Sequence, residues 1–259
     1  MGETVKEAVL HCENITQRFS GLVAVSDVSM DVYTNEIVGV IGPNGAGKTT
    51  LFNDITGIYK PTEGKVFFGG EDITGMACHK ITAKGMTRTF QNIRLFNNMM
   101  AIDNVLVGLH TATKAGIAES MLHLGRHRRE EKESLARAEE VLQLTDLYEY
   151  RYHYADSLPY GLQRRLEIAR ALACHPKLIL LDEPAAGMNE QETTDLLQFI
   201  RKLKSMGNTI ILIEHDMRLV MNLCDRIYVL DHGTRIAEGT PDEVRKNPQV
   251  ITAYLGEEV

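Results

Sequence analysis

Short apolar segments separated by turn residues occupy the first seventy residues and predict a series of strands. They are expected at Ala8–Phe19, Ser29–Tyr33, Ile37–Ile41 and Lys65–Phe68. The third segment is a run of Ile and Val that leads directly into a glycine-rich stretch. Helical composition follows from Thr49 to Thr56 and stops at Gly57. The pattern therefore predicts a strand, a glycine-rich loop and a helix in direct succession.

Strands and helices alternate through the last hundred residues. Leu178–Leu181 is a continuous apolar run, which is typical of a strand buried on both faces of a parallel sheet. Helices are expected at Gln163–His175, Glu190–Met206 and Met217–Cys224, and further strands at Thr209–Glu214 and Arg226–Leu230. Such alternation implies βαβ units, so we expect an α/β fold with a mainly parallel sheet.

The character of the chain changes between residues 92 and 156. Glycine thins out, and Glu130–Leu147 combines apolar residues at helical spacing with Glu and Arg between them. We expect a helical subdomain, 92–156, inserted into a single domain that spans 1–259. The α/β core would then consist of 1–91 and 157–259.

Composition narrows the function classes. The 259 residues are 44% hydrophobic and 24% charged, as in a globular protein with a sizeable core. A net charge of −7 argues against non-specific nucleic-acid binding, which needs a basic surface. No apolar run approaches the roughly 20 residues that cross a bilayer, the start lacks a secretory pattern, and the four cysteines are isolated. We therefore expect a cytoplasmic protein that meets a membrane only through a partner.

The glycine-rich stretch matches the pattern GxxxxGK[ST] in full, between a predicted strand and a predicted helix. Its residues are Gly42, Pro43, Asn44, Gly45, Ala46, Gly47, Lys48 and Thr49. Glycines let backbone N–H groups wrap a polyphosphate, and the following helix adds the positive end of its dipole. In this pattern Lys48 reaches the β and γ phosphates and Thr49 holds magnesium. The sequence thus predicts a nucleoside triphosphate site with Mg²⁺.

Two acids follow the apolar strand at 178–181, where a phosphate site needs a carboxylate for its metal. Asp182 comes directly after the apolar run and Glu183 comes next. Adjacent residues on a strand point in opposite directions, so the two carboxylates need not compete for one ion. Asp182 is expected to hold magnesium, while Glu183 polarises the attacking water.

These motifs, in this order, resemble those of the ATP-binding subunits of ABC transporters over nearly the whole chain. The resemblance implies a P-loop NTPase (RecA-like) core with an N-terminal antiparallel β subdomain. It also implies that Phe19 stacks on adenine, that Gln91 touches magnesium or the water, and that His215 reaches the γ-phosphate of ATP. Catalysis would then fall to Glu183, His215, Lys48 and Gln91, and magnesium binding to Thr49, Gln91 and Asp182. Nucleotide contacts would come from Phe19, Gly42, Pro43, Asn44, Gly45, Ala46, Gly47, Lys48, Thr49, Thr50, Leu158, Pro159, Tyr160 and Gly161.

The segment that would complete the site of an opposite subunit departs from the family pattern LSGGQ. It reads Leu158-Pro159-Tyr160-Gly161-Leu162, so a proline replaces the serine whose hydroxyl binds phosphate. The loss of one hydrogen bond to an ionised acceptor corresponds to about 1.5–3 kcal/mol. A second departure puts Asn189 where the family usually has an aspartate. Both changes affect how strongly this segment would bind the ATP of the opposite subunit. We still expect the segment to complete that subunit's site.

Both departures are similar to the subfamily that imports branched-chain amino acids. So are the stretch Gln163–Arg170, the insert after His110 and the ending Asn247–Gly256. The resemblance implies that two such subunits sandwich two ATP molecules at the inner face of the cell membrane. Their partners would be permease subunits and, indirectly, a periplasmic or extracellular binding protein. A sister ATPase is favoured as the second subunit, with a second copy of the chain still open, and Asn92–Phe96 would help receive a permease helix.

Other functions stay open on the sequence. A related importer for urea or short amides, or a lipopolysaccharide-exporting ATPase, fits the same motifs, although the insert near Gly116–Arg129 favours an importer. A soluble ABC-type switch acting on ribosomes or DNA usually has two cassettes or a long coiled coil, and this sequence has neither. A non-hydrolytic binding module is disfavoured by four intact residues: Lys48, Asp182, Glu183 and His215. We expect no nucleic-acid partner, and no residue indicates which substrate is transported.

Overall fold

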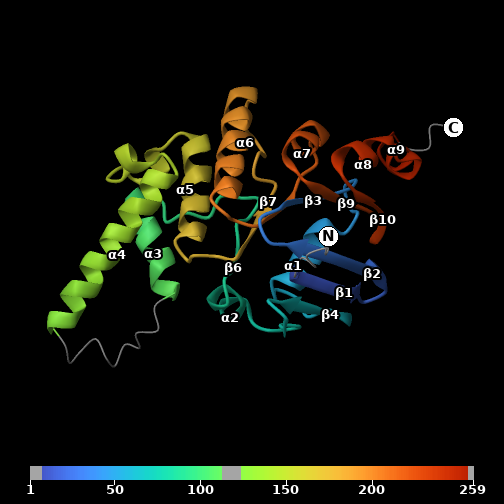
Figure 1. Cartoon of the computed structure of the whole chain (residues 1–259), viewed down its shortest axis with the longest axis horizontal. Coiled ribbons are helices and arrows are strands. Elements are labelled where there is room, and N and C mark those ends of the chain that lie inside the picture. Colours follow the sequence, from blue (N-terminus) through green and yellow to red (C-terminus); the bar gives the residue numbers. More distant parts are fainter. Residues whose placement is uncertain (1–7, 113–123, 256–259) are drawn as a thin grey trace, which may run out of the picture.

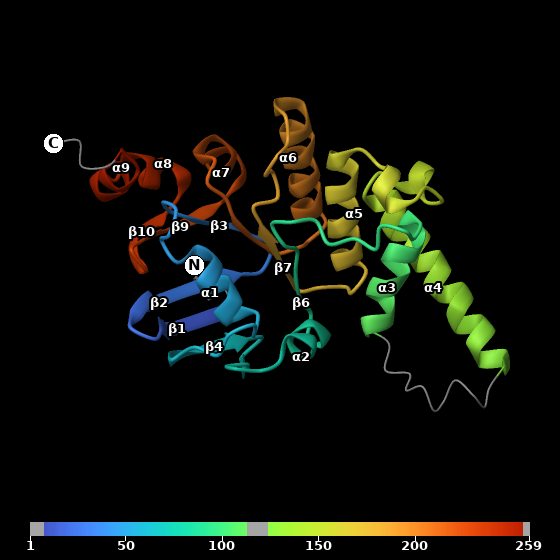
Figure 2. The same cartoon turned by 180° about the vertical axis from the view of Figure 1, so that it is seen from behind.

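The computed structural model describes residues 8–112 and 124–255 of the chain (Figure 1). The described residues form two sheets and a group of helices set to one side of them (Figures 1 and 2). Residues 116–123 of the segment that bears on the choice between importer and exporter lie outside the described ranges. No described helix is long and apolar enough to cross a membrane.

The larger sheet carries the strands that the sequence predicts to be parallel. Its order is β10-β9-β3-β8-β7-β6, with β3 (Ile37–Ile41), β6 (Met86–Arg88), β7 (Leu178–Asp182), β8 (Ile210–Ile213), β9 (Arg226–Asp231) and β10 (Thr234–Gly239). All neighbouring strands pair in parallel except β9 and β10. The carboxyl ends of β3 and β7 therefore meet at one edge, which is where open α/β sheets bind ligands.

Residues of β7 alternate between two cores, one on each face of the larger sheet. Leu178 and Leu180 join a core closed by the second sheet and by α1 (Lys48–Ile55). Ile179 and Leu181 face a layer of helices instead. Those helices are α6 (Glu190–Ser205), α7 (Met217–Leu223), α8 (Pro241–Lys246) and α9 (Pro248–Leu255). The continuous apolar run is thus confirmed as a strand covered on both faces.

The smaller sheet is antiparallel and comes from the N-terminal part of the chain, as the family resemblance implies. Its order is β2-β1-β4-β5, with β1 (Ala8–Phe19), β2 (Leu22–Tyr33), β4 (Glu63–Phe68) and β5 (Glu71–Asp72). The prediction of a strand that begins at Ser29 was wrong, because β2 begins at Leu22. Asp27 has a φ of 55°, and the β1–β2 register shifts beside it. This irregularity interrupts the alternation of apolar and polar residues, so the sequence pattern does not reveal the first half of β2 as a strand.

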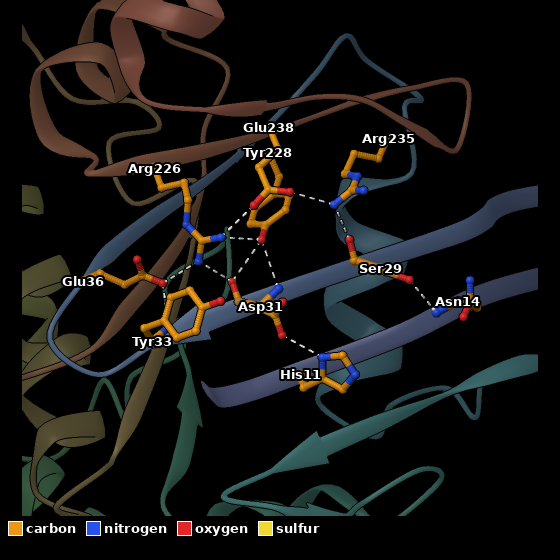
Figure 3. Close-up of polar contacts among 10 residues, drawn as sticks. All are labelled: His11, Asn14, Ser29, Asp31, Tyr33, Glu36, Arg226, Tyr228, Arg235 and Glu238. Carbon is orange, nitrogen blue, oxygen red and sulfur yellow. Dashed lines mark hydrogen bonds and ion pairs between the residues drawn. The ribbon is translucent and has the colours of Figure 1, made fainter. Parts of the chain in front are cut away.

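A network of polar side chains joins the smaller sheet to the edge of the larger one (Figure 3). Arg226 donates to Oε1 of Glu36 at 2.8 Å and to the backbone carbonyl of Asp31 at 2.7 Å. It also donates to Oε1 of Glu238 at 2.7 Å and to the Tyr228 hydroxyl at 2.8 Å. The Arg226 side chain is only 19% exposed, so this arginine fixes β2, β9 and β10 relative to one another.

A group of helices lies at the side of the molecule (Figure 1). These helices have a hydrophobic core of their own. They are α3 (Ala101–Ala112), α4 (Leu124–Leu144) and α5 (Tyr160–Leu172), with the short turns η1 (Tyr148–Tyr150) and η2 (Ala155–Ser157) between the last two, and α2 (Cys78–Ala83) precedes them in the chain. Leu166 and Ala169 of α5 join buried residues of α3 and α4 in this core. The helical core therefore extends beyond residue 156 into α5.

Two helix starts differ from the prediction. α4 begins at Leu124 rather than Glu130, and α5 begins at Tyr160 rather than Gln163. Pro159 stands directly before α5, and the fixed φ of proline suits the entrance to a helix. The segment that departs from LSGGQ therefore includes the first turn of α5.

Candidate functional site

The glycine-rich cradle lies between β3 and α1, at the carboxyl edge of the larger sheet. Gly42 has a φ of 152°, and a Cβ added there meets the carbonyl oxygen of Leu230 at 2.1 Å. Gly47 has a φ of 95°, and a Cβ added there meets the carbonyl oxygen of Ala24 at 2.4 Å. These two positions therefore require glycine. Gly45 has a φ of 83° and open space around it, so its backbone is accessible to a ligand.

Lys48 begins α1 and folds back over the cradle. Its Nζ donates to the carbonyl oxygens of Gly42 at 2.7 Å and Pro43 at 2.9 Å. Burial lowers the pKa of Lys48, and the nearby carboxylates of Glu183 and Asp182 act in the opposite direction. Neutral carbonyls bind an ammonium group less strongly than ionised oxygens do. The Lys48 side chain is thus placed to exchange these carbonyls for a phosphate.

The predicted metal ligand Asp182 ends β7 and is 4% exposed. Its Oδ2 accepts a hydrogen bond from Nη2 of Arg88 at 2.7 Å, and both side chains are almost completely buried. Sequence reasoning missed Arg88, which ends β6 beside β7. A single arginine carries no pattern, and its position becomes visible only when the order of the strands is known.

Glu183 leaves the strand in a left-handed backbone conformation, with a φ of 44°. Because β7 has already ended, this turn rather than strand alternation separates its carboxylate from that of Asp182. Oε2 of Glu183 accepts a hydrogen bond from Nε2 of Gln91 at 2.7 Å, and Nδ1 of His215 lies 3.8 Å from the same oxygen. A left-handed backbone conformation costs a non-glycine residue about 1–3 kcal/mol, and residues held in such a conformation cluster at functional sites. Three of the residues predicted to be catalytic therefore meet at one carboxylate.

A buried acid, Glu214, holds the backbone on both sides of this group. One of its oxygens accepts from the N–H of Ala185 at 3.0 Å and the other from the N–H of His215 at 3.3 Å. Burial raises the pKa of Glu214. Asp216, on the other side of His215, caps α7 through its side chain. The two acids beside the histidine therefore have structural roles that fix its position.

The segment Leu158–Gly161 forms the entrance to α5. Leu158 is buried in the helical core, its N–H donates to the carbonyl oxygen of Ala155 at 3.4 Å, and its own carbonyl oxygen accepts from Nε2 of Gln163 at 2.8 Å. Tyr160 is 39% exposed, and its hydroxyl donates to the carbonyl oxygen of Ala186 at 3.0 Å. No side chain caps α5 at Pro159. The N–H groups of Leu162 and Gln163 donate to the carbonyl oxygen of Pro159 at 2.9 and 3.0 Å, so among the described residues the N–H groups of Tyr160 and Gly161 are left without a partner at this helix start.

Asn189, the second departure from the family pattern, is the N-cap of α6. Its Oδ1 accepts from the N–H of Glu192 at 3.0 Å, and its own N–H donates to Oε2 of Glu192 at 3.1 Å. This reciprocal pair is a capping box. An aspartate would cap the helix equally well, so nothing in the structure explains why an amide replaces an acid here.

Phe19, which the resemblance assigns to adenine stacking, ends β1 and is 38% exposed. Its ring meets that of Tyr59 edge to face, with the ring centroids 5.2 Å apart. Phe19 is therefore not a core phenylalanine, and the two rings offer an exposed aromatic surface.

Thr49 is exposed on the first turn of α1, and Thr50 is half-buried beside it.

Arg164, on α5, is a second residue that sequence reasoning missed, and it is fully buried. Its Nη1 donates to the carbonyl oxygen of Phe90 at 2.7 Å and to Oε2 of Glu167 at 2.8 Å. Its Nη2 donates to the carbonyl oxygen of Gln91 at 2.6 Å. The entrance helix α5 thus holds the backbone that carries Gln91. Arginines in a polar stretch usually indicate an exposed face, so the sequence carries no signal for this role.

A groove of about 450 Å³ opens between the α/β core and the helices at its side. Its lining includes Leu95 and Phe96, which the resemblance assigns to docking of a permease helix. Phe96 is 46% exposed, and the guanidinium of Arg170 lies 5.7 Å from its ring centroid. Burial lowers the pKa of Arg170, while Glu167, also in the lining, acts in the opposite direction. The groove therefore combines an exposed aromatic ring with a half-buried cation.

The oxygen-bearing side chains predicted to bind metal suit a magnesium ion that arrives with a nucleotide. Within residues 8–112 and 124–255, no group of three His, Cys, Asp or Glu side chains is placed to hold a metal by itself. Thr49, Gln91 and Asp182 offer hydroxyl, amide and carboxylate oxygens, which are the ligands that Mg²⁺ prefers. Mg²⁺ usually takes few protein ligands and completes its shell with phosphate and water. The residues present fit that kind of site.

Two family models match the sequence. The model described as ABC transporter matches residues 25–186, and the model described as branched-chain amino acid ATP-binding cassette transporter matches residues 234–259. The chain is 47% identical over 250 residues to the high-affinity branched-chain amino acid transport ATP-binding protein BraF of Pseudomonas aeruginosa. That alignment covers 96% of this chain and 98% of BraF.

Solved structures give the same picture. The ADP conformation of MJ1267, an ATP-binding cassette of an ABC transporter, has a TM-score of 0.84 and 33% identity, and the match covers 97% of this chain and 100% of that one. A dimeric post-hydrolysis state of the ATP-binding cassette MJ0796, bound to ADP and Pi, has a TM-score of 0.74 and 27% identity. That match covers 90% of this chain and 98% of MJ0796.

Proposed function

The chain belongs to the ABC transporter family, as an ATP-binding subunit of a branched-chain amino acid importer, and we propose that it hydrolyses ATP at the carboxyl edge of its larger sheet. In this proposal the cradle and Lys48 bind the phosphates, and Phe19 with Tyr59 contacts the base. Thr49, Asp182 and the amide oxygen of Gln91 hold Mg²⁺. The ion, when bound, neutralises charge on the phosphates and orients them.

Glu183 is the general base of the proposed reaction. Gln91 and His215 both lie close to Oε2 of Glu183. The other oxygen, Oε1, has no hydrogen bond or ion pair within the described part of the chain. We assign to Oε1 the proton of the attacking water. His215 and Lys48 then stabilise the charge that moves onto the transferred phosphate. The observation that carries the proposal is the 2.7 Å hydrogen bond between Gln91 and Glu183, which brings together two motifs from distant parts of the chain.

His215→Ala tests this assignment. Release of phosphate from ATP is expected to fall by about 10²-fold or more, while equilibrium binding of ATP changes little. His232→Ala is the matched control, because that side chain is 96% exposed in a different loop. Normal turnover in His215→Ala would show that the histidine does not act on the phosphate.

The chain is proposed to act as one half of a dimer. At the entrance of α5, the N–H groups of Tyr160 and Gly161 have no partner among the described residues and no side chain caps the helix, which suits a phosphate held by a second subunit. The dimeric form of MJ0796 supports this arrangement. We propose that the second subunit is a sister ATP-binding chain or another copy of this one. One chain alone would then contain only half of each complete site.

The groove beside Phe96 is proposed to receive a cytoplasmic helix of a permease subunit. It combines exposed apolar surface with the cation of Arg170, which suits the carboxyl end of a helix or an acidic side chain. Docking there would hold the chain at the inner face of the cell membrane. A periplasmic or extracellular binding protein would act on the permeases and touch this chain only indirectly.

Leu95→Ala with Phe96→Ala tests the docking proposal. The tagged chain is recovered from its native membranes in mild detergent, and the proteins that accompany it are identified by mass spectrometry. The double variant is expected to lose the permeases and to keep ATP binding. Met206→Ala, a change at another exposed apolar side chain, is the control. Recovery of the wild-type chain with ribosomes or DNA, or alone, would contradict the proposed partners.

A further inference from the structure

Arg88 connects Asp182 to the far end of the helix that begins at the cradle. Its Nη2 donates to Oδ2 of Asp182 at 2.7 Å. Its Nη1 donates to Oδ1 of Asn53 at 2.7 Å and to Oγ1 of Thr56 at 3.2 Å. Asn53 lies in α1 and Thr56 is its C-cap. One guanidinium therefore joins the strand that ends in the metal ligand to the helix whose first residues bind phosphate.

The surroundings of Arg88 leave its guanidinium little freedom. The side chain is 6% exposed, and the group lies 5.6 Å from the ring centroid of Phe52 and 5.2 Å from that of Phe90. Within the described residues its Nε is buried without a hydrogen-bond partner. A buried cation is stable only with a fixed anionic partner. Asp182 is that partner, so its carboxylate is fixed as well.

Only one oxygen of Asp182 is engaged in this way. Within the described part of the chain, Oδ1 has no hydrogen bond or ion pair, whereas Oδ2 is held by Arg88. We propose that Arg88 is a positioning residue for Asp182, which holds Oδ2 and thereby presents Oδ1 to the Mg²⁺ that accompanies ATP. The inference rests on the proposed function, because it requires Asp182 to be a metal ligand.

The shape of the arginine fork is part of the inference. Two different nitrogens reach Asp182 and Asn53, so the carboxylate is fixed relative to α1 as well as to its own strand. A lysine at this position would supply the charge from a single nitrogen and could not span both partners. A glutamine would offer a neutral donor. The two replacements therefore separate charge from geometry.

The test uses the full chain and a non-hydrolysable ATP analogue, AMP-PNP. Binding is measured by calorimetry in EDTA and at increasing Mg²⁺, and the bound metal is followed by electron paramagnetic resonance with Mn²⁺ in place of Mg²⁺. Arg88→Gln is expected to raise the Mg²⁺ needed for half-maximal effect by about 10-fold, the lower end for loss of a residue that orients a metal ligand. Arg88→Lys is expected to recover part of this loss. Affinity in EDTA should stay unchanged in both.

Arg226→Gln is the matched control. Arg226 is also a largely buried arginine held by carboxylates, but it lies in the network between the two sheets (Figure 3). It is expected to lower the melting temperature and to leave the Mg²⁺ requirement unchanged. An unchanged or lower Mg²⁺ requirement in Arg88→Gln would overturn the inference. So would an equal loss of AMP-PNP binding in EDTA, which would identify Arg88 as a residue of the fold alone.

Asp182→Asn distinguishes failure of the inference from failure of the proposed function. If Asp182→Asn leaves the Mg²⁺ requirement unchanged, Asp182 is not a metal ligand and both proposals are wrong at this point. If Asp182→Asn raises the requirement while Arg88→Gln does not, only the role of Arg88 is wrong. If both raise it, with affinity in EDTA intact, the positioning role is confirmed.

Discussion

The glycine-rich cradle and the entrance of α5 are both helix N-termini proposed to face phosphate, yet they differ in what their own chain provides. The cradle has the lysine side chain already in place and two positions that require glycine. At the entrance of α5, Pro159 provides no cap and the Tyr160 hydroxyl is used within its own subunit. Under the proposed function, this difference assigns ATP binding to one chain and turnover to the pair.

Glu183→Gln should separate these two properties most strongly. The amide has nearly the same size but cannot take the proton of water, so turnover is expected to fall by about 10²–10⁴-fold. Binding of ATP at the cradle is expected to persist. Phosphate release and equilibrium binding measure the two effects, and Glu190→Gln, at an exposed acid on α6, is the control. Unchanged turnover would exclude Glu183 as the general base.

Lys48→Ala attacks the cradle itself. It removes the charged donor at the phosphates, a hydrogen bond of about 1.5–3 kcal/mol, and affinity for ATP is expected to fall by roughly 10–100-fold. The effect should be visible in the isolated chain, because the cradle needs no partner. Lys65→Ala, at an exposed lysine on β4, should bind ATP normally. Equal affinities in the two variants would show that the buried ammonium never leaves its carbonyl partners.

Pro159→Ser tests the entrance of α5. The serine hydroxyl would cap α5 and offer the missing donor to a phosphate held by the other subunit. We expect ATP-dependent association of the Glu183→Gln chain to strengthen by up to about 10-fold, as one hydrogen bond to an ionised acceptor allows. Analytical ultracentrifugation measures the association, with Pro176→Ser beyond the other end of α5 as the control. Unchanged association would mean that this contact does not pass through residue 159.

Asp54→Asn should leave the cradle and the entrance of α5 functional and alter only the stability of the fold. Asp54 lies on α1, is 2% exposed, and its Oδ2 is buried without a hydrogen-bond partner among the described residues. Burial raises its pKa to about 7. The unfolded chain releases this proton near pH 4, so stability is lost as the pH rises from about 4 to about 7. The substitution removes that loss.

The melting temperature of Asp54→Asn is therefore expected to exceed that of the wild type by a few degrees near pH 8. At about pH 2–3, where the carboxyl is mostly protonated in both the folded and the unfolded state, the two proteins should melt alike. Differential scanning calorimetry at the two pH values measures this, and Asp156→Asn, at an exposed acid, is the control. A variant that melts lower than the wild type at both pH values would show that Asp54 is stabilising as a carboxylate.

The cradle half of the site could be predicted from local pattern. The strand at 37–41, the glycine-rich loop and the helix after it follow one another in sequence, and the structure has them in the same places. The meeting of Gln91, Glu183 and His215 is non-local, yet the family order of motifs anticipates it. Family resemblance thus supplied what the spacing of residues alone does not contain.

Arg88 and Arg164 could not be predicted in this way. The contact of Arg88 with Asp182 depends on β6 lying next to β7, and that of Arg164 depends on α5 packing against the backbone of Gln91. Both arginines are buried, although arginine is usually exposed. The start of β2 was misplaced for a different reason, because the irregularity at Asp27 interrupts its alternation. These features follow from tertiary packing, on which local pattern is silent.

Arg164 has a consequence for communication between the two nucleotides of the proposed dimer. In the proposed dimer, Gln91 would serve the ATP bound by its own chain, and the entrance of α5 would serve the ATP bound by the partner. Arg164 sits on α5 and holds the backbone carbonyls of Phe90 and Gln91. In that dimer, a displacement of α5 by the partner's ATP would reach Gln91 through this fully buried side chain. Each subunit would in this way report the occupancy of one site to the other.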